Sequence, residues 1–245
     1  MKADLEEALV PLQWAEAQIQ TFRERFAAWQ RSRPYELVME PNPNAPEIQF
    51  LVAYRRKPLD PLMIGDAGAI INSIRAALDV LWMLILRRHG FEPGRDMAFP
   101  VKRNAAEFEA AAEALKSKYR CSDGELSAVK RTRAYRGGND FLYPLHQLAI
   151  QPRHYRLLIV KPAVDRAQIE KLEGAFLYPT PLNAQEKSIL AGIPARARFR
   201  PSYGNVLLGS EAFLDEPALL KAETTANLAL VRFAGTVREI VESFP

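Results

Sequence analysis

The chain has 245 residues, of which 48% are apolar. This length and composition suit one domain with a sizeable core and exclude an intrinsically disordered protein. The formal net charge of +4 arises from 33 basic and 29 acidic residues, so the chain as a whole is only mildly basic. Its single cysteine, Cys121, excludes an internal disulfide and a zinc cluster built on several cysteines, and it fits a reducing compartment.

Targeting and membrane signals are not visible in the sequence. The first thirty residues carry charges throughout, which predicts no signal peptide. The most apolar stretch, residues 76–86, is far shorter than the roughly 20 residues of a membrane-spanning helix. We therefore expect a cytoplasmic protein without a membrane partner.

The N-terminal third predicts a helix, a pair of strands and a second helix. Apolar residues at alternating steps of three and four indicate an amphipathic helix that becomes regular near Pro11. Residues 35–40 and 47–56 are typical of strands, with a proline-rich loop between them. Residues 61–89 follow as a long helix, ended by Gly90 and apolar nearly all round, which predicts a central place in the core. The apolar stripe of the first helix is Leu5, Ala8, Leu12, Ala15, Ile19, Phe22, Phe26 and Trp29.

Two capping signals organise the middle of the chain. Asn104 is placed to cap a helix that ends near Tyr119. Ser122 and Glu125 have the spacing of a capping box, which predicts another helix over about 123–135. A further helical region is expected over 141–160 and a loop over 170–183.

The C-terminal part predicts a strand pair and a last helix. Arg196, Arg198 and Arg200 alternate with apolar residues, the pattern of a strand with one charged face, and residues 206–208 would pair with it. The apolar stripe of the last helix is Ala226, Leu230, Phe233, Val237, Ile240 and Phe244.

Together these elements predict an α+β fold, mainly a helical bundle of five or six helices with a small antiparallel sheet. We expect a single domain over residues 1–245, with β-strands inserted around 35–56 and 187–208. Because the first and last helices each have one apolar stripe, both should pack against the 61–89 helix.

Many catalytic signatures are absent from the sequence. It contains no GxxxxGK[ST], GxGxxG, HExxH, GxSxG or CxxC. None of the three histidines has another within four residues, which excludes a locally assembled multi-histidine metal site. A nucleophilic Cys121 would need a distant histidine. We therefore expect neither a cofactor nor a metal.

Arg75 and Asp79 form the first polar constellation. They lie four residues apart on the central helix and so face one another at the edge of its apolar stripe. Charges there are costly unless they are paired. The pair is either a salt bridge that ties this helix to a neighbour or part of a polar site between helices.

The second constellation follows the Gly137–Gly138 break. Gly-Gly-Asn is compatible with an anion cradle of exposed amides, and also with a turn that ends a helix. The imidazoles downstream, beside arginines, are candidate ligands for a phosphate or carboxylate, or histidines satisfied within the core. We expect Arg75 and Asp79 to contact each other and at least one of His146, Arg153 or His154. The candidate residues of this second group are Asn139, His146, Arg153, His154 and Arg156.

Charge is concentrated between Lys116 and Lys161. This segment has ten basic and three acidic residues, a local excess of positive charge that can attract an anionic ligand or a nucleic acid. A solvated face balanced by acidic helices beside it has the same composition.

The order of these motifs resembles a widespread bacterial family of uncharacterised hypothetical proteins. Its pattern runs N-L-R-S-A-L-D-H, F-P-[IV], Y-x-G-G-N, L-x-x-L-H-x-L-D-I and D-K-H-R. The matching stretches cover residues 60–160 and include Gly65-Asp66, 73–80, 99–101, 135–139, 145–150 and 153–156. Val80 stands where the family has His, and Ala149 where it has Asp. The resemblance implies no activity.

R-S-A-L-D-H is also similar to the Arg-x4-6-His signature of HEPN-type ribonucleases, which are helical bundles. That resemblance would imply a general base and a cation for cleavage at the RNA 2′-hydroxyl. Val80 cannot transfer a proton, so this copy would be catalytically degenerate.

Three functional hypotheses remain open. The first is a non-catalytic binding or interaction module with a polar site between helices. The second is an enzyme that acts on RNA or another phosphate-bearing substrate. The third is a structural homodimer that associates through the first helix.

Overall fold

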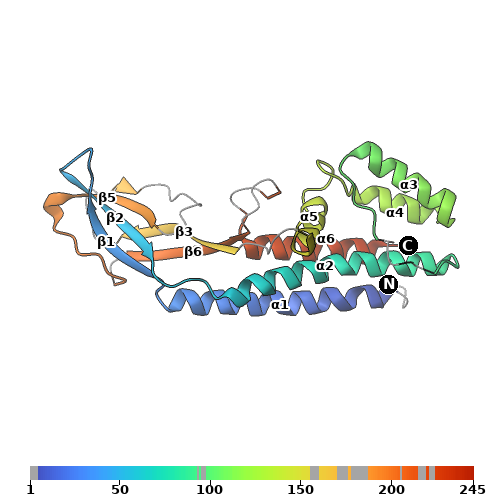
Figure 1. Ribbon diagram of the computed structural model, residues 1–245, viewed down its shortest axis with the longest axis horizontal. Helices are drawn as coiled ribbons and strands as arrows, with labels where there is room; N and C mark the ends of the chain where they lie inside the picture. The colour runs from blue at the N-terminus through green and yellow to red at the C-terminus, as the bar shows by residue number, and fades with distance from the viewer. Residues whose placement is uncertain are drawn as a thin grey trace.

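The structure is a computed structural model that describes residues 5–92, 94, 98–154, 160–169, 176–177, 187–204, 206–214, 219–220 and 224–245. Within these ranges the side chains of 151–154, 160–166, 176–177, 207 and 209 are not described. The molecule is elongated, with the β-strands gathered at one end and the helices extending to the other (Figure 1). The fold is α+β and mainly helical, as the sequence predicts.

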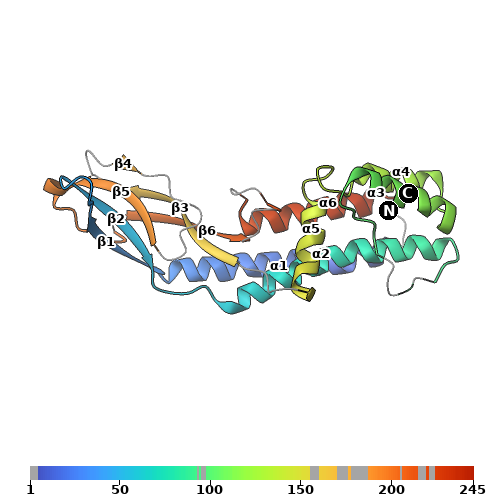
Figure 2. The same ribbon diagram turned by 45° about the horizontal axis from the view of Figure 1, so that its top comes forward.

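Three long helices run side by side and form the body of the molecule (Figures 1 and 2). They are α1 (Glu6–Arg31), α2 (Pro61–Arg88) and α6 (Ala226–Ser243). Phe26 of α1 and Phe233 of α6 are both buried, so the first and last helices pack against the central one as expected. All eight residues of the predicted α1 stripe are buried, because the three-four spacing places them on one helix face.

Three shorter helices lie on this body. They are α3 (Ala105–Tyr119), α4 (Asp123–Thr132) and α5 (Leu142–His154). Helices α3 and α4 form a hairpin at the end of the molecule opposite the strands, and α5 crosses the bundle (Figures 1 and 2). The Asn104 side chain accepts from the Glu107 amide, and Ser122 and Glu125 form the predicted capping box.

The β-region consists of a four-stranded antiparallel sheet and a two-stranded ribbon. The sheet has the order β1-β2-β5-β4 and the ribbon pairs β3 with β6. The strands are β1 (Tyr35–Pro41), β2 (Ile48–Arg55), β3 (Val160–Ile169), β4 (Phe176–Leu177), β5 (Lys187–Pro194) and β6 (Val206–Leu214). One hydrophobic cluster includes residues of the sheet and of all three long helices.

The structure corrects the strand predicted at Arg196–Arg200. Residues 195–197 form a 3-10 turn, and Arg198 has a left-handed backbone with φ of 47°. The strand lies just before it, as β5, whose pairing with β2 ends where the Ala195 amide donates to the Glu47 carbonyl. Residues 206–208 belong to β6 and pair with β3, because tertiary pairing and not local alternation decides which segment joins a sheet.

Three helix and loop boundaries also differ from the predictions. Helix α1 begins at Glu6 and contains Pro11, instead of becoming regular near it. The expected helical region over 141–160 ends as α5 at His154, and Val160 already lies in β3. Most of the loop predicted over 170–183 lies outside the described residues, but 176–177 form β4.

Helix α2 is long and apolar enough to cross a membrane by length and composition. The prediction from the sequence considered only residues 76–86 and therefore missed the length of this apolar helix. In the structure 61% of its most apolar window is buried inside the protein. Since the core helix of a globular fold has the same composition, this feature carries no conclusion about a membrane.

Candidate functional site

Arg75 and Asp79 contact one another on α2, as the i,i+4 spacing predicts. Arg75 Nη1 donates to Asp79 Oδ1 at 2.7 Å. The Arg75 side chain is 6% exposed, whereas that of Asp79 is 34% exposed. The cation is therefore inside the protein and its counter-charge lies at the boundary with solvent.

The backbone of Phe99 completes the pairing on both sides. Arg75 Nη2 donates to the Phe99 carbonyl oxygen at 3.0 Å, and the Phe99 amide donates to Asp79 Oδ1 at 2.9 Å. Phe99 is itself buried. The ion pair thus fixes the segment between α2 and α3 onto α2, and it satisfies main-chain groups that would otherwise be costly to bury.

His146 brings α5 to the same cluster. Arg75 Nε donates to His146 Nδ1 at 3.3 Å, which confirms the predicted contact between the two constellations. Burial, together with the positive charges of Arg75 and Lys102, lowers the pKa of His146 to about 4. The imidazole is consequently neutral near pH 7.

The hydrogen bond from Arg75 also fixes the tautomer of His146. A guanidinium can only donate, so Nδ1 must accept and the imidazole proton must lie on Nε2. The basic lone pair of His146 is therefore directed at Arg75. In this arrangement His146 can donate one hydrogen bond from Nε2–H. Its only basic lone pair, on Nδ1, accepts from Arg75 and is not available to a substrate.

The Gly137–Asn139 segment is a tight turn that begins α5. Gly137 has a φ of +82°, and a Cβ on Gly138 would lie 2.5 Å from the Arg133 carbonyl oxygen. The Gly138 and Asn139 amides donate to the Tyr135 carbonyl oxygen, at 2.9 and 3.4 Å, so these amides are not directed at a ligand. The Asn139 Oδ1 accepts from the amides of Phe141, just before α5, and of Leu142, its first residue.

The remaining residues predicted for this site fall where the structure gives no side-chain information. Arg153 and His154 occupy the last turn of α5, where the backbone alone is described. Arg156 lies outside the described residues. The structure therefore joins Arg75, Asp79 and His146, and it assigns Asn139 to the neighbouring turn.

The basic segment is partly neutralised by acidic residues. Lys116 contacts Asp123 at 2.6 Å, and Lys130 contacts both Glu109 and Glu113 of α3. These pairings raise the pKa values of both lysines.

Two arginines extend the basic surface beyond these lysines. Arg131 and Arg133 are exposed, and among the described residues neither has an ion pair with an acid. They lie along an open groove of about 530 Å³ on α4, which is also lined by Asp123, Leu126, Ser127 and Lys130.

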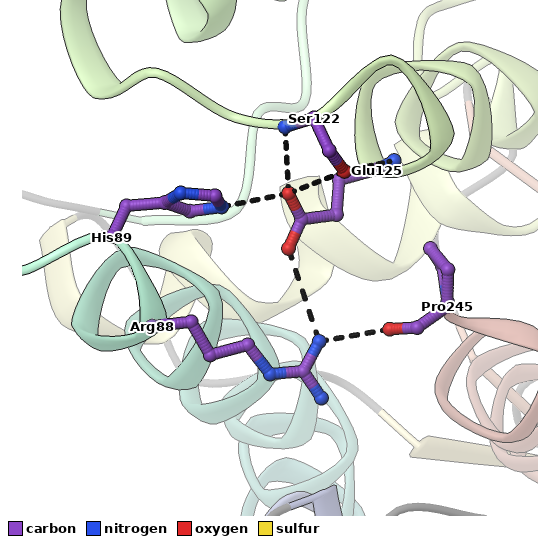
Figure 3. A network of polar contacts seen from close by, with 5 residues as sticks. All are labelled: Arg88, His89, Ser122, Glu125 and Pro245. Atoms are coloured by element: carbon purple, nitrogen blue, oxygen red, sulfur yellow. Dashed lines mark hydrogen bonds and ion pairs between the residues drawn. The ribbon is translucent and has the colours of Figure 1, made fainter.

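A second polar cluster, which the sequence analysis missed, joins α2 to α4. Figure 3 shows His89, at the end of α2, directed at Glu125 of α4, with Ser122 and Arg88 on the same carboxylate. His89 Nε2 lies 2.7 Å from Glu125 Oε2. Cys121 is adjacent, and the ligating atoms of His89, Cys121 and Glu125 all lie within 4.8 Å of one another. No sequence signal connects His89 to Cys121, since 31 residues separate them.

Comparisons of the chain with protein-family models, with curated proteins and with solved structures gave no significant match.

Proposed function

We propose that this chain is a non-catalytic binding or interaction module whose Arg75 cluster holds α2, α5 and the Phe99 segment together. The observation that carries the proposal is the hydrogen bond from Arg75 Nε to His146 Nδ1. It occupies the lone pair that a general base needs, and burial of Arg75 removes the cation that would stabilise a phosphorane in solvent reach.

The predicted consequence is that the purified protein lacks metal-independent ribonuclease activity. The assay uses a mixed RNA pool with chelator present and compares wild type with a His146→Ala, His154→Ala double variant. His154 is included because the sequence places it near Arg153 and Arg156. We expect no cleavage above background in either sample. Cleavage by wild type that disappears in the double variant would contradict the proposal and favour the enzyme.

We further propose that the partner is anionic and binds the groove on α4. The support is the pair of exposed arginines, Arg131 and Arg133, beside Lys130, which neutralises Glu109 and Glu113 of α3. An arginine fork suits phosphate and carboxylate oxygens, and neighbouring positive charges on an open surface attract anions. Nucleic acid is one anion of this kind.

Binding of a labelled single-stranded RNA, followed by fluorescence anisotropy, tests the groove. Replacing Arg131 and Arg133 by Glu should weaken binding by about tenfold or more at low salt, because charge neutralisation of phosphates dominates such binding. The matched control replaces Arg23 and Arg56 by Glu, which makes the same change in net charge on α1 and beside β2. Equal loss in both double variants would show that only net charge matters and would contradict a site on α4.

A further inference from the structure

The side chains of His89, Cys121 and Glu125 bring a nitrogen, a sulfur and an oxygen close together. These three ligand atoms lie within 4.8 Å of one another. In tetrahedral zinc sites the ligand atoms are roughly 3.5 Å apart, as follows from metal–ligand distances of 2.0–2.3 Å. For one ion to bind all three atoms, the longest separation would have to shorten by roughly 1 Å, and the 2.7 Å contact between His89 Nε2 and Glu125 Oε2 would have to lengthen.

The combined charge of the three side chains suits a divalent ion. Cys121 is 4% exposed, and burial together with the Glu125 charge raises the pKa of its thiol to about 11. Such a thiol is a poor nucleophile, which argues against a cysteine–histidine catalytic pair. A thiolate and a carboxylate together neutralise a 2+ ion, so the three groups can become one uncharged buried unit.

Neighbouring groups already orient the carboxylate of Glu125. Burial raises the pKa of Glu125, but hydrogen bonds from Ser122 and His89 outweigh this effect and lower it overall. Both the amide and the hydroxyl of Ser122 donate to Oε2 at 2.8 Å. On the other side Arg88 lies 3.8 Å from Oε1 and donates to the main-chain oxygen of Pro245 (Figure 3).

Arg88 is the charge that opposes a cation here. Its Nη1 is held by Pro245 and faces Oε1, whereas His89 faces Oε2 (Figure 3). The guanidinium and the imidazole therefore approach different oxygens of the carboxylate. Groups that orient a ligating carboxylate in this way are the usual outer shell of a protein metal site.

We propose that His89, Cys121 and Glu125 form a binding site for a zinc-class divalent ion that fastens the α3–α4 hairpin to the end of α2. A nitrogen, sulfur and oxygen set suits Zn²⁺ or Co²⁺, with water in the fourth position. Binding converts the Cys121 thiol to a metal thiolate and releases its proton to solvent. This proposal is independent of the proposed function, since neither Arg75 nor the α4 groove takes part.

The test titrates the reduced, chelator-treated full chain with Co²⁺ alone. Cys121 is the only cysteine, so a near-ultraviolet thiolate-to-cobalt charge-transfer band reports this residue specifically. We expect the band to saturate at about one ion per chain and to disappear when Zn²⁺ displaces cobalt. Absence of the band, or its persistence in a Cys121→Ser variant, would overturn the proposal.

The histidine ligand has a matched control in the other cluster. His89→Gln should weaken cobalt affinity by about tenfold or more, whereas His146→Gln should leave it unchanged. Equal affinities in both variants would overturn the assignment of His89.

A measurement on wild type alone tests the site without relying on a variant that could fail to fold. Zinc added at pH 7 should slow alkylation of Cys121 by iodoacetamide by about tenfold or more, because the metal-bound sulfur is no longer a free thiol. An unchanged alkylation rate at saturating zinc would overturn the proposal.

Discussion

Helix α2 contributes to two polar clusters that differ in what their polar atoms face. In the Arg75 cluster each of the three guanidinium nitrogens donates to a group of the same protein: His146, Asp79 or the Phe99 carbonyl. In the His89 cluster the ligand atoms of His89, Cys121 and Glu125 lie within 4.8 Å of one another. The groups around Arg75 are donors paired with acceptors, whereas nitrogen, sulfur and oxygen atoms gathered this closely are the ligand types that a transition-metal ion binds.

Burial of a charged residue does not by itself indicate a functional site. Arg75 is the most conspicuous charge in the core, yet its contacts are those of a fastening between α2, α5 and Phe99. The His89 cluster lies at a helix end and contains residues that each have an ordinary role as a cap or a buried thiol. Only their shared geometry sets them apart.

The largest expected effect comes from removing the counter-charge of Arg75. Asp79→Asn should lower the free energy of unfolding by about 2–3 kcal/mol, because the buried guanidinium loses its ion pair and Phe99 loses a charged acceptor. Urea denaturation measures it. Glu36→Gln, the same chemical change in an exposed pair with Arg56, should cost about 0.5 kcal/mol or less. Equal losses would mean that the Arg75 cluster is not a buried network.

Acidification should weaken the first cluster through His146. The pKa of this residue is about 4 in the folded protein and near 6.5 when unfolded, so the unfolded state binds more protons between these values. The contribution is present above pH 6.5 and is lost as the pH falls toward 4. After discounting for the partly exposed ring, we expect a loss of roughly 1–2 kcal/mol over this window.

The same pH series on His146→Gln isolates the contribution of the imidazole to the unfolding free energy. The variant lacks the titrating ring, so its unfolding free energy should fall less steeply than that of wild type between pH 6.5 and pH 4. Parallel curves would show that His146 remains able to bind a proton in the folded state, and would reopen its use as a general base.

The smallest effect is expected in the second cluster without metal. Ser122→Ala removes the cap of α4 and one donor to Glu125, and it should cost about 1 kcal/mol in urea denaturation. Asn104→Ala, which removes the cap of α3 at a distance from Glu125, provides the control. If Ser122 also orients a metal ligand, saturating Zn²⁺ should stabilise wild type more than Ser122→Ala, and should stabilise Asn104→Ala as much as wild type.

Much of the helical framework could be predicted because its signals are local. The three-four spacing fixed the buried face of α1, and the caps at Asn104 and Ser122 marked where α3 and α4 begin. The contact of Arg75 with Asp79 followed from one turn of helix geometry. These features depend on residues a few positions apart, so no knowledge of the rest of the chain was needed.

Tertiary structure decided the features that join distant segments. The alternation at Arg196–Arg200 looked like a strand, yet β5 precedes it because the free edge of β2 pairs with residues 187–194. The β3–β6 ribbon joins segments about 45 residues apart in the same way. His89 and Cys121 meet because α2 ends where α4 begins in space. Packing of the helices sets that position, and the chain has no local pattern that encodes it.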